Sequence, residues 1–303
     1  MDSHHSSLAH SPDLQTEENH TLRKSLVILG AGYVARFLFP FASRRYAHVL
    51  ATSRVPENHL SHIAPNRRIL FALTQQDTWK NIPNETDLLW CFPAMPLNLV
   101  QEFAATLDPP SRRLVVLGST SAYDIGSSRE YPPPWIDESA PIDLTRPRVQ
   151  GEEFLRINCG AIVLRVAGIY GPGRNPLDWI RTGRVGPSRK YVNLIHVNDL
   201  ATISLATLQH GTPGDVYNVS DGLPRTWADI CRITEQRWSI HPASSELSAT
   251  PGKRILNNKI LSLLQADHAS LRHSDFLQAL EELLNRSVMP GAAPLPQDTQ
   301  EDY

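Results

Sequence analysis

A glycine-rich turn near residue 30 has the residue types and spacing that bind phosphate groups. An apolar run, residues 26–29, leads into the pattern G-x-G-x-x-A, which is made of Gly30, Ala31, Gly32, Tyr33, Val34 and Ala35. Gly30 permits a tight turn, Gly32 lets the backbone approach a pyrophosphate, and Ala35 keeps the following helix close to the strand. Because the pattern follows a buried-type strand and opens a helix, it predicts a dinucleotide site. The alternative is a turn that sterics require and that holds no ligand.

The end of the next strand bears on which dinucleotide is bound. NAD-binding chains carry a carboxylate about 20 residues after the turn, where it bonds the ribose 2′-hydroxyl. This chain has Ala51, Thr52, Ser53 and Arg54 there, without an acidic side chain. Ser53 and Arg54 can instead hold a 2′-phosphate, so the sequence favours NADP over NAD as the cofactor. The alternative is that Arg54 is a solvated surface residue.

The segments that must position this turn alternate between strand-like and helix-like patterns. Short apolar runs typical of strands buried on both faces are separated by amphipathic stretches. The expected strands are residues 26–29, 47–52, 68–72, 87–91, 114–117, 161–166 and 216–219, and the expected helices are residues 33–45, 97–106 and 149–158. This alternation predicts an α/β fold with a doubly wound parallel sheet covered by helices on both faces.

Composition divides the chain into two tails and a folded part. Residues 1–24 are polar and contain scattered histidines, residues 288–303 are rich in Pro, Ala and acids, and we expect both tails to be disordered. Residues 25–167 are the expected dinucleotide-binding domain. Residues 168–287 are the expected smaller, discontinuous substrate region, of which residues 191–221 return to the main sheet.

Local signals in the last third predict its helices. Residues 168–190 are rich in Gly and Pro and are expected to be mostly loop. Asn198 or Asp199 is expected to cap the next helix, and Thr226 begins a pattern resembling a capping box. Leucines spaced along residues 276–284 mark one face of a final amphipathic helix.

Composition and charge exclude several classes of function. The 303 residues include 29 Lys and Arg against 31 Asp and Glu, for a formal net charge of −2. That balance gives no electrostatic attraction to nucleic acid or to an anionic membrane, and no apolar run is long enough to span a bilayer. The 3 cysteines lie far apart, which fits a reducing compartment and shows no metal-ligand spacing. We therefore expect a cytoplasmic protein without a bound metal.

Five further segments carry motifs in a fixed order along the chain. They are Leu117–Tyr123 (LGSTSAY), Trp135–Pro141 (WIDESAP), Leu164–Arg174 (LRVAGIYGPGR), Asn193–Ala201 (NLIHVNDLA) and Tyr217–Gly222 (YNVSDG). With the glycine turn, they make the chain resemble the extended short-chain dehydrogenase/reductase family, of the NAD-dependent epimerase/dehydratase type, over nearly all of residues 25–287. The resemblance implies a Rossmann fold with a small-molecule substrate bound between the sheet and the smaller region.

The same resemblance implies a catalytic set of Ser or Thr, Tyr and Lys, with Tyr and Lys spaced Y-x-x-x-K. Ser119 stands at the position of the Ser or Thr, although its hydroxyl could instead satisfy the end of a strand. Aligning Gly151 and Glu152 with the family's [AG]E pair places Leu144 at the Tyr position and Arg148 at the Lys position. Leu144 cannot transfer a proton. Arg148 stays protonated, so it can anchor a ribose or a phosphate but is a poor proton donor.

Other residues fall within the implied substrate site. The resemblance assigns to it Ser119, Ser121, Tyr123, Arg174 and Asn193. Tyr123 or His196 could replace the missing proton donor, although packing is the preferred interpretation for both. Cys91, at the end of the fourth expected strand, is interpreted as an inert thiol.

A basic cluster lies further along the same region. It consists of Arg181, Arg184, Arg189 and Lys190. These side chains either hold an anionic substrate or belong to a solvated loop.

Two functions compete for this sequence. The first is an NADP-dependent oxidoreductase or epimerase that acts on a sugar or another small carbonyl or hydroxyl compound, and Ser119 favours it. The second is a non-catalytic NADP-binding regulatory or sensor protein, which the loss of the Tyr-x-x-x-Lys pair favours. A structural module without a ligand is a third and poorer interpretation. We expect a monomer or a homodimer, which the resemblance would pair through residues 97–106 and 149–158.

Overall fold

The computed structural model describes residues 23–107, 113–125, 130–243 and 251–288. Most of both predicted tails therefore lies outside the described residues. Three residues assigned to the tails belong to regular structure: Arg23 and Lys24 open the first strand, and Val288 closes the last helix.

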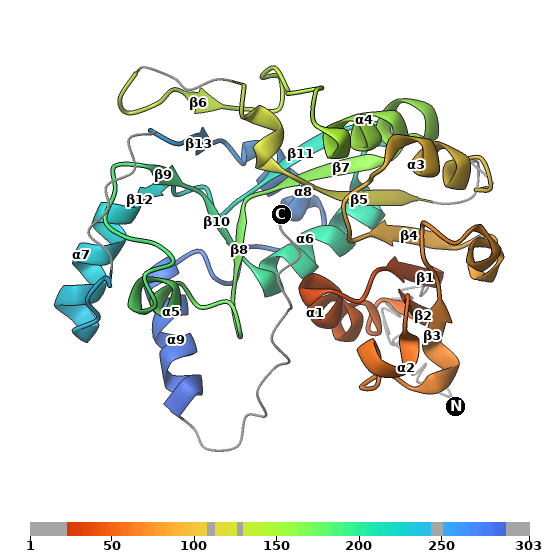
Figure 1. Ribbon diagram of the computed structural model, residues 1–303, viewed down its shortest axis with the longest axis horizontal. Helices are drawn as coiled ribbons and strands as arrows, with labels where there is room; N and C mark the ends of the chain where they lie inside the picture. The colour runs from red at the N-terminus through yellow and green to blue at the C-terminus, as the bar shows by residue number, and fades with distance from the viewer. Residues whose placement is uncertain (1–22, 108–112, 126–129, 244–250, 289–303) are drawn as a thin grey trace, which may run out of the picture.

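Within the described residues, seven parallel strands form the central sheet (Figure 1). In chain order they are β1 (Arg23–Leu29), β2 (Tyr46–Ser53), β3 (Arg68–Leu70), β4 (Asp87–Trp90), β5 (Leu114–Ser119), β7 (Ile162–Val166) and β11 (Val216–Val219). Their order in space is β11-β7-β5-β4-β1-β2-β3, so the direction of winding reverses between β1 and β4. This is the doubly wound order of the Rossmann fold, and the predicted fold class is confirmed.

Helices cover both faces of this sheet (Figure 1). One face carries α1 (Tyr33–Ala42), α6 (Val197–His210) and α8 (Asn258–Ala266), and the other carries α3 (Leu97–Ala104) and α4 (Pro147–Cys159). In β1, Leu26 and Ile28 pack into the first face, whereas Val27 and Leu29 pack into the second. Successive side chains of a strand point to opposite faces, which explains why this strand is a continuous apolar run.

The smaller region is built from short strands and three helices beside the sheet (Figure 1). Its elements are β6 (Trp135–Ile136), β8 (Gly168–Tyr170), α5 (Pro176–Arg181), β9 (Tyr191–Val192), β10 (Leu194–His196), β12 (Arg225–Thr226), α7 (Trp227–Trp238), β13 (Arg254–Ile255) and α9 (Phe276–Val288). The strands pair as β8 with β10, β9 with β12, and β6 with β13. Tyr170, Trp227 and Phe276 belong to its own apolar core.

Several element boundaries differ by a few residues from the sequence expectation. The first helix ends at Ala42 rather than at residue 45. The stretch 168–190 is less irregular than its Gly and Pro content suggests, because β8 pairs with β10 and Pro176 occupies the first turn of α5. Proline is well tolerated there, since the first helical N–H groups have no partner within the helix.

The cap of α6 is a correction to the sequence analysis. His196 is the N-cap, and its Nδ1 accepts a hydrogen bond of 3.2 Å from the backbone N–H of Asn198. Asp199 instead accepts hydrogen bonds of 2.9 Å from the backbone N–H groups of Arg272 and His273. That carboxylate therefore fixes the segment before α9. The predicted cap of α7 is confirmed, because Thr226 Oγ1 accepts from the N–H of Asp229 at 3.0 Å.

Candidate functional site

The glycine turn forms the junction between β1 and α1. Gly30 has a φ of +108°, a conformation that side-chain-bearing residues rarely adopt, and its N–H donates to Thr52 Oγ1 at 2.9 Å. Gly32 is the N-cap of α1, where no side chain caps the helix. A Cβ built on Gly32 would meet nothing within 4 Å. An uncapped helix N-terminus therefore faces open space, which suits the negative charge of a pyrophosphate.

This turn lies at the switch point of the sheet. The carboxyl ends of β2, β1, β4 and β5 stand next to one another in that order. In open α/β sheets, ligands bind in the crevice outside the carboxyl ends of the strands at the switch point. An elongated ligand bound here would pass from Arg54 at the end of β2, over the glycine turn, to Ser119 at the end of β5.

The two residues at the end of β2 are in different environments. Ser53 is buried, its Oγ accepts a hydrogen bond of 3.0 Å from the N–H of Val55, and it lies 2.8 Å from His59 Nδ1. Local contacts therefore already occupy the Ser53 hydroxyl. Arg54 is exposed. Of the two predicted contacts for a 2′-phosphate, Arg54 is the one whose side chain faces solvent.

Arg174 reaches the glycine turn from the smaller region. Its guanidinium carbon lies 4.4 Å from the centroid of the Tyr33 ring. Gly171, in the same loop, has a φ of +150°, and a Cβ there would come within 2.9 Å of the Tyr33 hydroxyl. The predicted substrate residue Arg174 thus stands beside the phosphate turn, within the β8–α5 loop.

Ser119 ends β5 at the other side of the switch point. Its Oγ accepts a hydrogen bond of 3.1 Å from the N–H of Ser121 and so caps the short 3-10 helix Thr120–Tyr123. This is the strand-end contact that the sequence offered as the alternative to a catalytic role. A hydroxyl that accepts one hydrogen bond can still donate its own proton, so the two roles are compatible.

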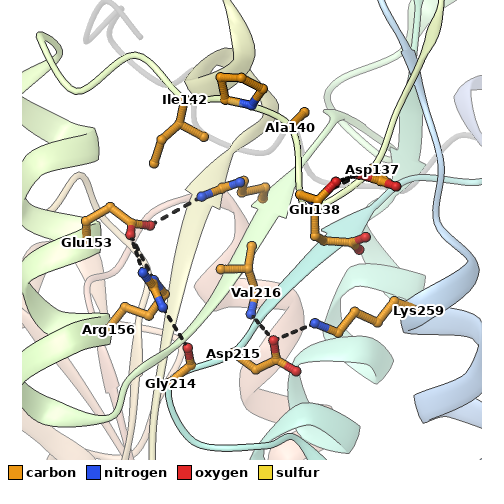
Figure 2. Close-up of a pocket in the computed structure, with 13 residues that line it drawn as sticks. Asp137, Glu138, Ala140, Ile142, Glu153, Arg156, Gly214, Asp215, Val216 and Lys259 are labelled. Carbon is orange, nitrogen blue, oxygen red and sulfur yellow. Dashed lines mark hydrogen bonds and ion pairs between the residues drawn. The ribbon is translucent and has the colours of Figure 1, made fainter.

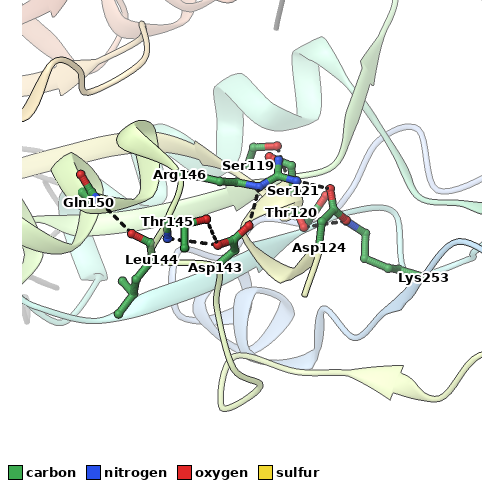
Figure 3. Close-up of polar contacts among 10 residues, drawn as sticks. All are labelled: Ser119, Thr120, Ser121, Asp124, Asp143, Leu144, Thr145, Arg146, Gln150 and Lys253. Carbon is green, nitrogen blue, oxygen red and sulfur yellow. Dashed lines mark hydrogen bonds and ion pairs between the residues drawn. The ribbon is translucent and has the colours of Figure 1, made fainter. Parts of the chain in front are cut away.

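If Leu144 took the place of the family's Tyr, its side chain would lie beside Ser119 and share a helix face with Arg148, and the structure contradicts both expectations. α4 begins at Pro147, so Leu144 precedes the helix and does not share a helix face with Arg148. The Leu144 side chain is 56% exposed and points away from Ser119 (Figure 3). The proline at residue 147 explains the difference, because it disfavours helical backbone in the residue before it.

Arg148 is held by its own helix and by the sheet. Its Nε donates to Glu152 Oε1 at 2.7 Å, and its Nη2 donates to the carbonyl oxygen of Leu117 at 2.9 Å. Burial raises the pKa of Glu152, and the neighbouring Arg148 acts against that rise. Arg148 therefore ties α4 to the end of β5, two residues before Ser119.

A cluster of charged side chains surrounds the turn after Ser119 (Figure 3). Lys253 Nζ donates to the carbonyl oxygen of Thr120 at 2.8 Å and pairs with Asp124. Arg146 pairs with Asp124 at 3.4 Å and with Asp143 at 3.1 Å. Burial lowers the pKa of Lys253; Asp124 acts against this shift, and Arg146 adds to it.

Sequence reasoning missed this cluster. Lys253 stands 133 residues from Thr120 along the chain, and neither Lys253 nor Asp124 belongs to a helix or strand pattern that marks a site. The only local signal is the position of Asp124, directly after the LGSTSAY segment. Tertiary structure alone brings the lysine to this turn.

Asn193 and Tyr123, both predicted to bind substrate, have other partners. Asn193 Nδ2 donates to the carbonyl oxygen of Lys253 and its Oδ1 accepts from the N–H of Ile255, both at 2.9 Å. Tyr123 is buried, donates to Asn218 Oδ1 at 2.7 Å and accepts from Arg165 at 2.9 Å. These contacts engage both side chains within the protein, and their direct contact with a substrate stays a prediction.

His196 and Cys91 both pack against other parts of the protein. The His196 ring stacks on His273 at 3.6 Å, between the glycine turn and α9. Cys91 follows β4 beside Gly30, and burial raises the pKa of its thiol. A raised pKa disfavours the reactive thiolate, which agrees with the interpretation of Cys91 as inert.

The basic cluster of residues 181–190 is dispersed. Arg181 pairs with Asp178 at 2.7 Å. Arg184 lies over the Trp179 ring at 5.5 Å, and Arg189 lies over the Tyr131 ring at 3.8 Å. Three of its cations are thus engaged separately, and they do not form one anion site.

A separate cavity of about 580 Å³ lies at the β11 edge of the sheet (Figure 2). It is lined by residues 137–142, Glu153, Arg156, Arg165, residues 214–216 and Lys259. Glu153 pairs with Arg156 at 2.7 Å and with Arg165 at 3.2 Å, and Lys259 pairs with Asp215. β7, β5 and β4 lie between β11 and β1 in the sheet, so the cavity is distinct from the crevice beside the glycine turn.

Neither a membrane span nor a metal site is found in the described part of the chain. Among the described residues, no helix has the length and apolar character needed to cross a bilayer. Those residues also contain no group of three or more His, Cys, Asp or Glu side chains arranged to hold a metal ion.

Solved structures share this architecture, whereas no protein-family model and no curated protein matches the sequence. A candidate NAD-dependent epimerase/dehydratase from Methylobacillus flagellatus is 22% identical, covers 88% of this chain and 99% of its own, and has a TM-score of 0.70. A short-chain dehydrogenase/reductase superfamily protein from Agrobacterium tumefaciens, solved with bound NAD, is 14% identical over 87% of this chain and 97% of its own, with a TM-score of 0.67.

Human epimerase family protein SDR39U1 (isoform 2), solved with NADPH, is similar over 86% of this chain and 99% of its own, at 17% identity and a TM-score of 0.63. These likenesses extend over whole chains at low identity. The chain therefore has the fold of the epimerase/dehydratase-type short-chain dehydrogenase/reductase structures.

Proposed function

We propose that this chain is an atypical member of the extended short-chain dehydrogenase/reductase family that binds NADP at the switch point. One observation carries the proposal: the N-terminus of α1 is uncapped and faces open space at Gly32. That feature lies where the Rossmann fold binds a pyrophosphate. The similar structures that contain NAD or NADPH support the same cofactor class.

The residues at this site suit such a dinucleotide. The backbone of Gly30, Gly32 and the first turn of α1, residues 33–35, would hold the pyrophosphate. Arg174, beside Tyr33, would add a positive charge there. Arg54 would hold the 2′-phosphate that distinguishes NADP from NAD, and a guanidinium forms strong bidentate hydrogen bonds with phosphate.

The Ser119 end would receive the substrate. When bound, a nicotinamide cofactor supplies or accepts a hydride. Ser119, the last residue of β5, and Ser121 just after it would orient the oxygen of a small carbonyl or hydroxyl compound. We accordingly propose an oxidoreductase or epimerase, working in the cytoplasm as a monomer or homodimer.

A non-catalytic NADP-binding sensor is the second candidate. The exposed Leu144 and the engaged Arg148 favour it, because neither can serve as the acid or base of the family's reaction. The two candidates share cofactor binding and differ in turnover.

A titration of the full chain with NADPH and NADH tests both candidates. We expect NADPH to bind more tightly, followed by measurable turnover in a screen of sugar nucleotides and small aldehydes and ketones. Tight NADPH binding without turnover over the whole screen would favour the sensor. Absence of binding for both cofactors would reject the proposal, and a thermal melt in the same buffer verifies that the chain is folded.

A further inference from the structure

The lysine beside the Ser119 turn comes from a segment that carries none of the motifs on which the family resemblance rests. Lys253 immediately precedes β13, a strand that pairs with β6 and not with the main sheet. Its Nζ nevertheless donates to the carbonyl oxygen of Thr120, the residue that follows Ser119. The smaller region thereby delivers an amine to the carboxyl end of β5.

The backbone around Lys253 is held on both sides. Asn193 Oδ1 accepts a hydrogen bond from the N–H of Ile255, and Asn193 Nδ2 donates one to the carbonyl oxygen of Lys253, each at 2.9 Å. Tyr191 donates its N–H to the carbonyl of Pro251 at 2.9 Å. These contacts fix where the lysine side chain starts, so its reach to Thr120 is built into the fold.

The amine is neither free in solvent nor fully enclosed. The Lys253 side chain is 22% exposed, and that of its partner Asp124 is 42% exposed. An ammonium has three N–H donors, and the contacts with Thr120 and Asp124 use two of them. One donor therefore remains for an oxygen atom of a bound molecule.

The charges around Lys253 favour an amine that can lose its proton. Burial lowers its pKa most, and Arg146 and Lys190 lower it further, whereas Asp124 raises it. Asp143 faces Arg146 rather than the lysine. A lysine with a lowered pKa loses its proton more readily than an ordinary lysine, which favours general acid–base catalysis.

We propose that Lys253 is the acid–base group of this site and performs the proton transfer that Leu144 cannot. In reduction, the Lys253 ammonium gives a proton to the carbonyl oxygen of the substrate while the carbonyl carbon gains the hydride. In oxidation, the neutral amine takes the hydroxyl proton as the hydride leaves. Solvent water restores the original state of the amine. This inference rests on the proposed cofactor-dependent function.

The other cations near Ser119 are less suited to this role. Arg146 and Arg148 carry guanidinium groups, which stay protonated at working pH. Arg148 also donates to Glu152 and to the Leu117 carbonyl. Lys253 is thus the cation of this cluster that can exchange a proton.

Competition labelling of the full chain with acetic anhydride between pH 6 and 11, read by peptide mass spectrometry, measures the lysine directly. Lys259 serves as the internal control, because it also pairs with an aspartate, Asp215, but lies at the β11 edge. We expect a lower labelling midpoint for Lys253 than for Lys259. Asp124→Asn should lower the Lys253 midpoint further, whereas Asp215→Asn should leave it unchanged. Saturating NADPH should slow labelling of Lys253 only.

Turnover provides the second measurement. Lys253→Ala and Lys253→Arg should both lower turnover about 10²–10⁴-fold, since arginine keeps the charge but cannot transfer the proton. Both variants should retain NADPH binding, and Lys259→Arg should retain turnover.

The results separate this inference from the proposed function. A Lys253 midpoint at or above that of Lys259, or turnover that survives in Lys253→Arg, would overturn the role of the lysine. Loss of the proposed function appears instead in the cofactor titration of the unmodified chain, which does not depend on Lys253.

Discussion

The two ends of the crevice are built in different ways. At the glycine turn, residues 30–35 supply the geometry from one continuous segment between β1 and α1. At the Ser119 end, the charged side chains come from the β5 turn, the segment before α4 and the residue before β13. Phosphate binding needs backbone N–H groups and a helix terminus, which neighbouring residues can provide. Acid–base chemistry needs several side chains around one point, which distant segments must supply.

This comparison implies that glycines serve different purposes at the two ends. Gly32 borders open space, whereas a Cβ on Gly151 of α4 would overlap the carbonyl oxygen of Ala94, in the loop after β4. Gly32 leaves open space at the start of α1, whereas Gly151 allows α4 to pack closely against the loop after β4.

The largest effect is expected from Gly32→Val. A valine at this position would occupy the space that the pyrophosphate needs, so NADPH affinity should fall by at least about 100-fold, or about 2.7 kcal/mol. Because nothing lies within 4 Å of the added Cβ, the melting temperature should change little. Isothermal titration and a thermal melt measure the two quantities. Unchanged affinity in a folded variant would show that the turn is not the phosphate site.

Gly151→Ala is expected to lower stability rather than cofactor affinity. Its added methyl group must push α4 away from the Ala94 backbone, and such overpacking typically costs about 1–3 kcal/mol of the free energy of unfolding. Chemical denaturation measures this loss. Stability equal to that of the unmodified chain would contradict the close approach of α4 to this loop.

Arg54→Ala tests the preference for NADPH over NADH at the glycine-turn end of the crevice. Loss of a hydrogen bond to a charged group should weaken NADPH binding by about 1.5–3 kcal/mol and leave NADH binding nearly unchanged. Parallel titrations of both cofactors test the difference. Arg67→Ala is a matched control at another exposed arginine, the last residue of the 3-10 turn Pro65–Arg67 before β3. Equal loss for both cofactors would reject the 2′-phosphate contact.

The smallest effect is expected on the pH dependence of stability. It concerns Glu152, the partner of Arg148 near the Ser119 end of the crevice. Burial raises the pKa of Glu152 in the folded chain, so the folded state keeps a proton that the unfolded state releases. The free energy of unfolding should therefore fall as pH rises from the ordinary pKa of glutamate toward the raised value. Melting temperatures measured from pH 4 to 8 should show this decline, and Glu152→Gln should flatten it. An identical pH dependence in both proteins would contradict the raised pKa.

Sequence reasoning succeeded where one segment carries the information. The order of strands and helices follows from apolar runs and amphipathic stretches, and the glycine turn follows from six consecutive residues. It failed at Leu144, because an alignment with a family motif does not register that Pro147 delays the start of α4. It also did not anticipate the internal partners of Asn193 and Tyr123, the Lys253 carbonyl and Arg165, because these partners come from distant segments.

The sequence by itself determined the Rossmann sheet, the position of the glycine turn and the absence of an acidic residue after β2. These depend on local backbone conformation and on which residues must be buried. Tertiary structure decided which charged groups meet at Ser119. Lys253 reaches Thr120 because β13 pairs with β6 and Asn193 fixes the backbone between them. Contacts between residues more than a hundred positions apart depend on how whole elements pack, and no local pattern encodes them.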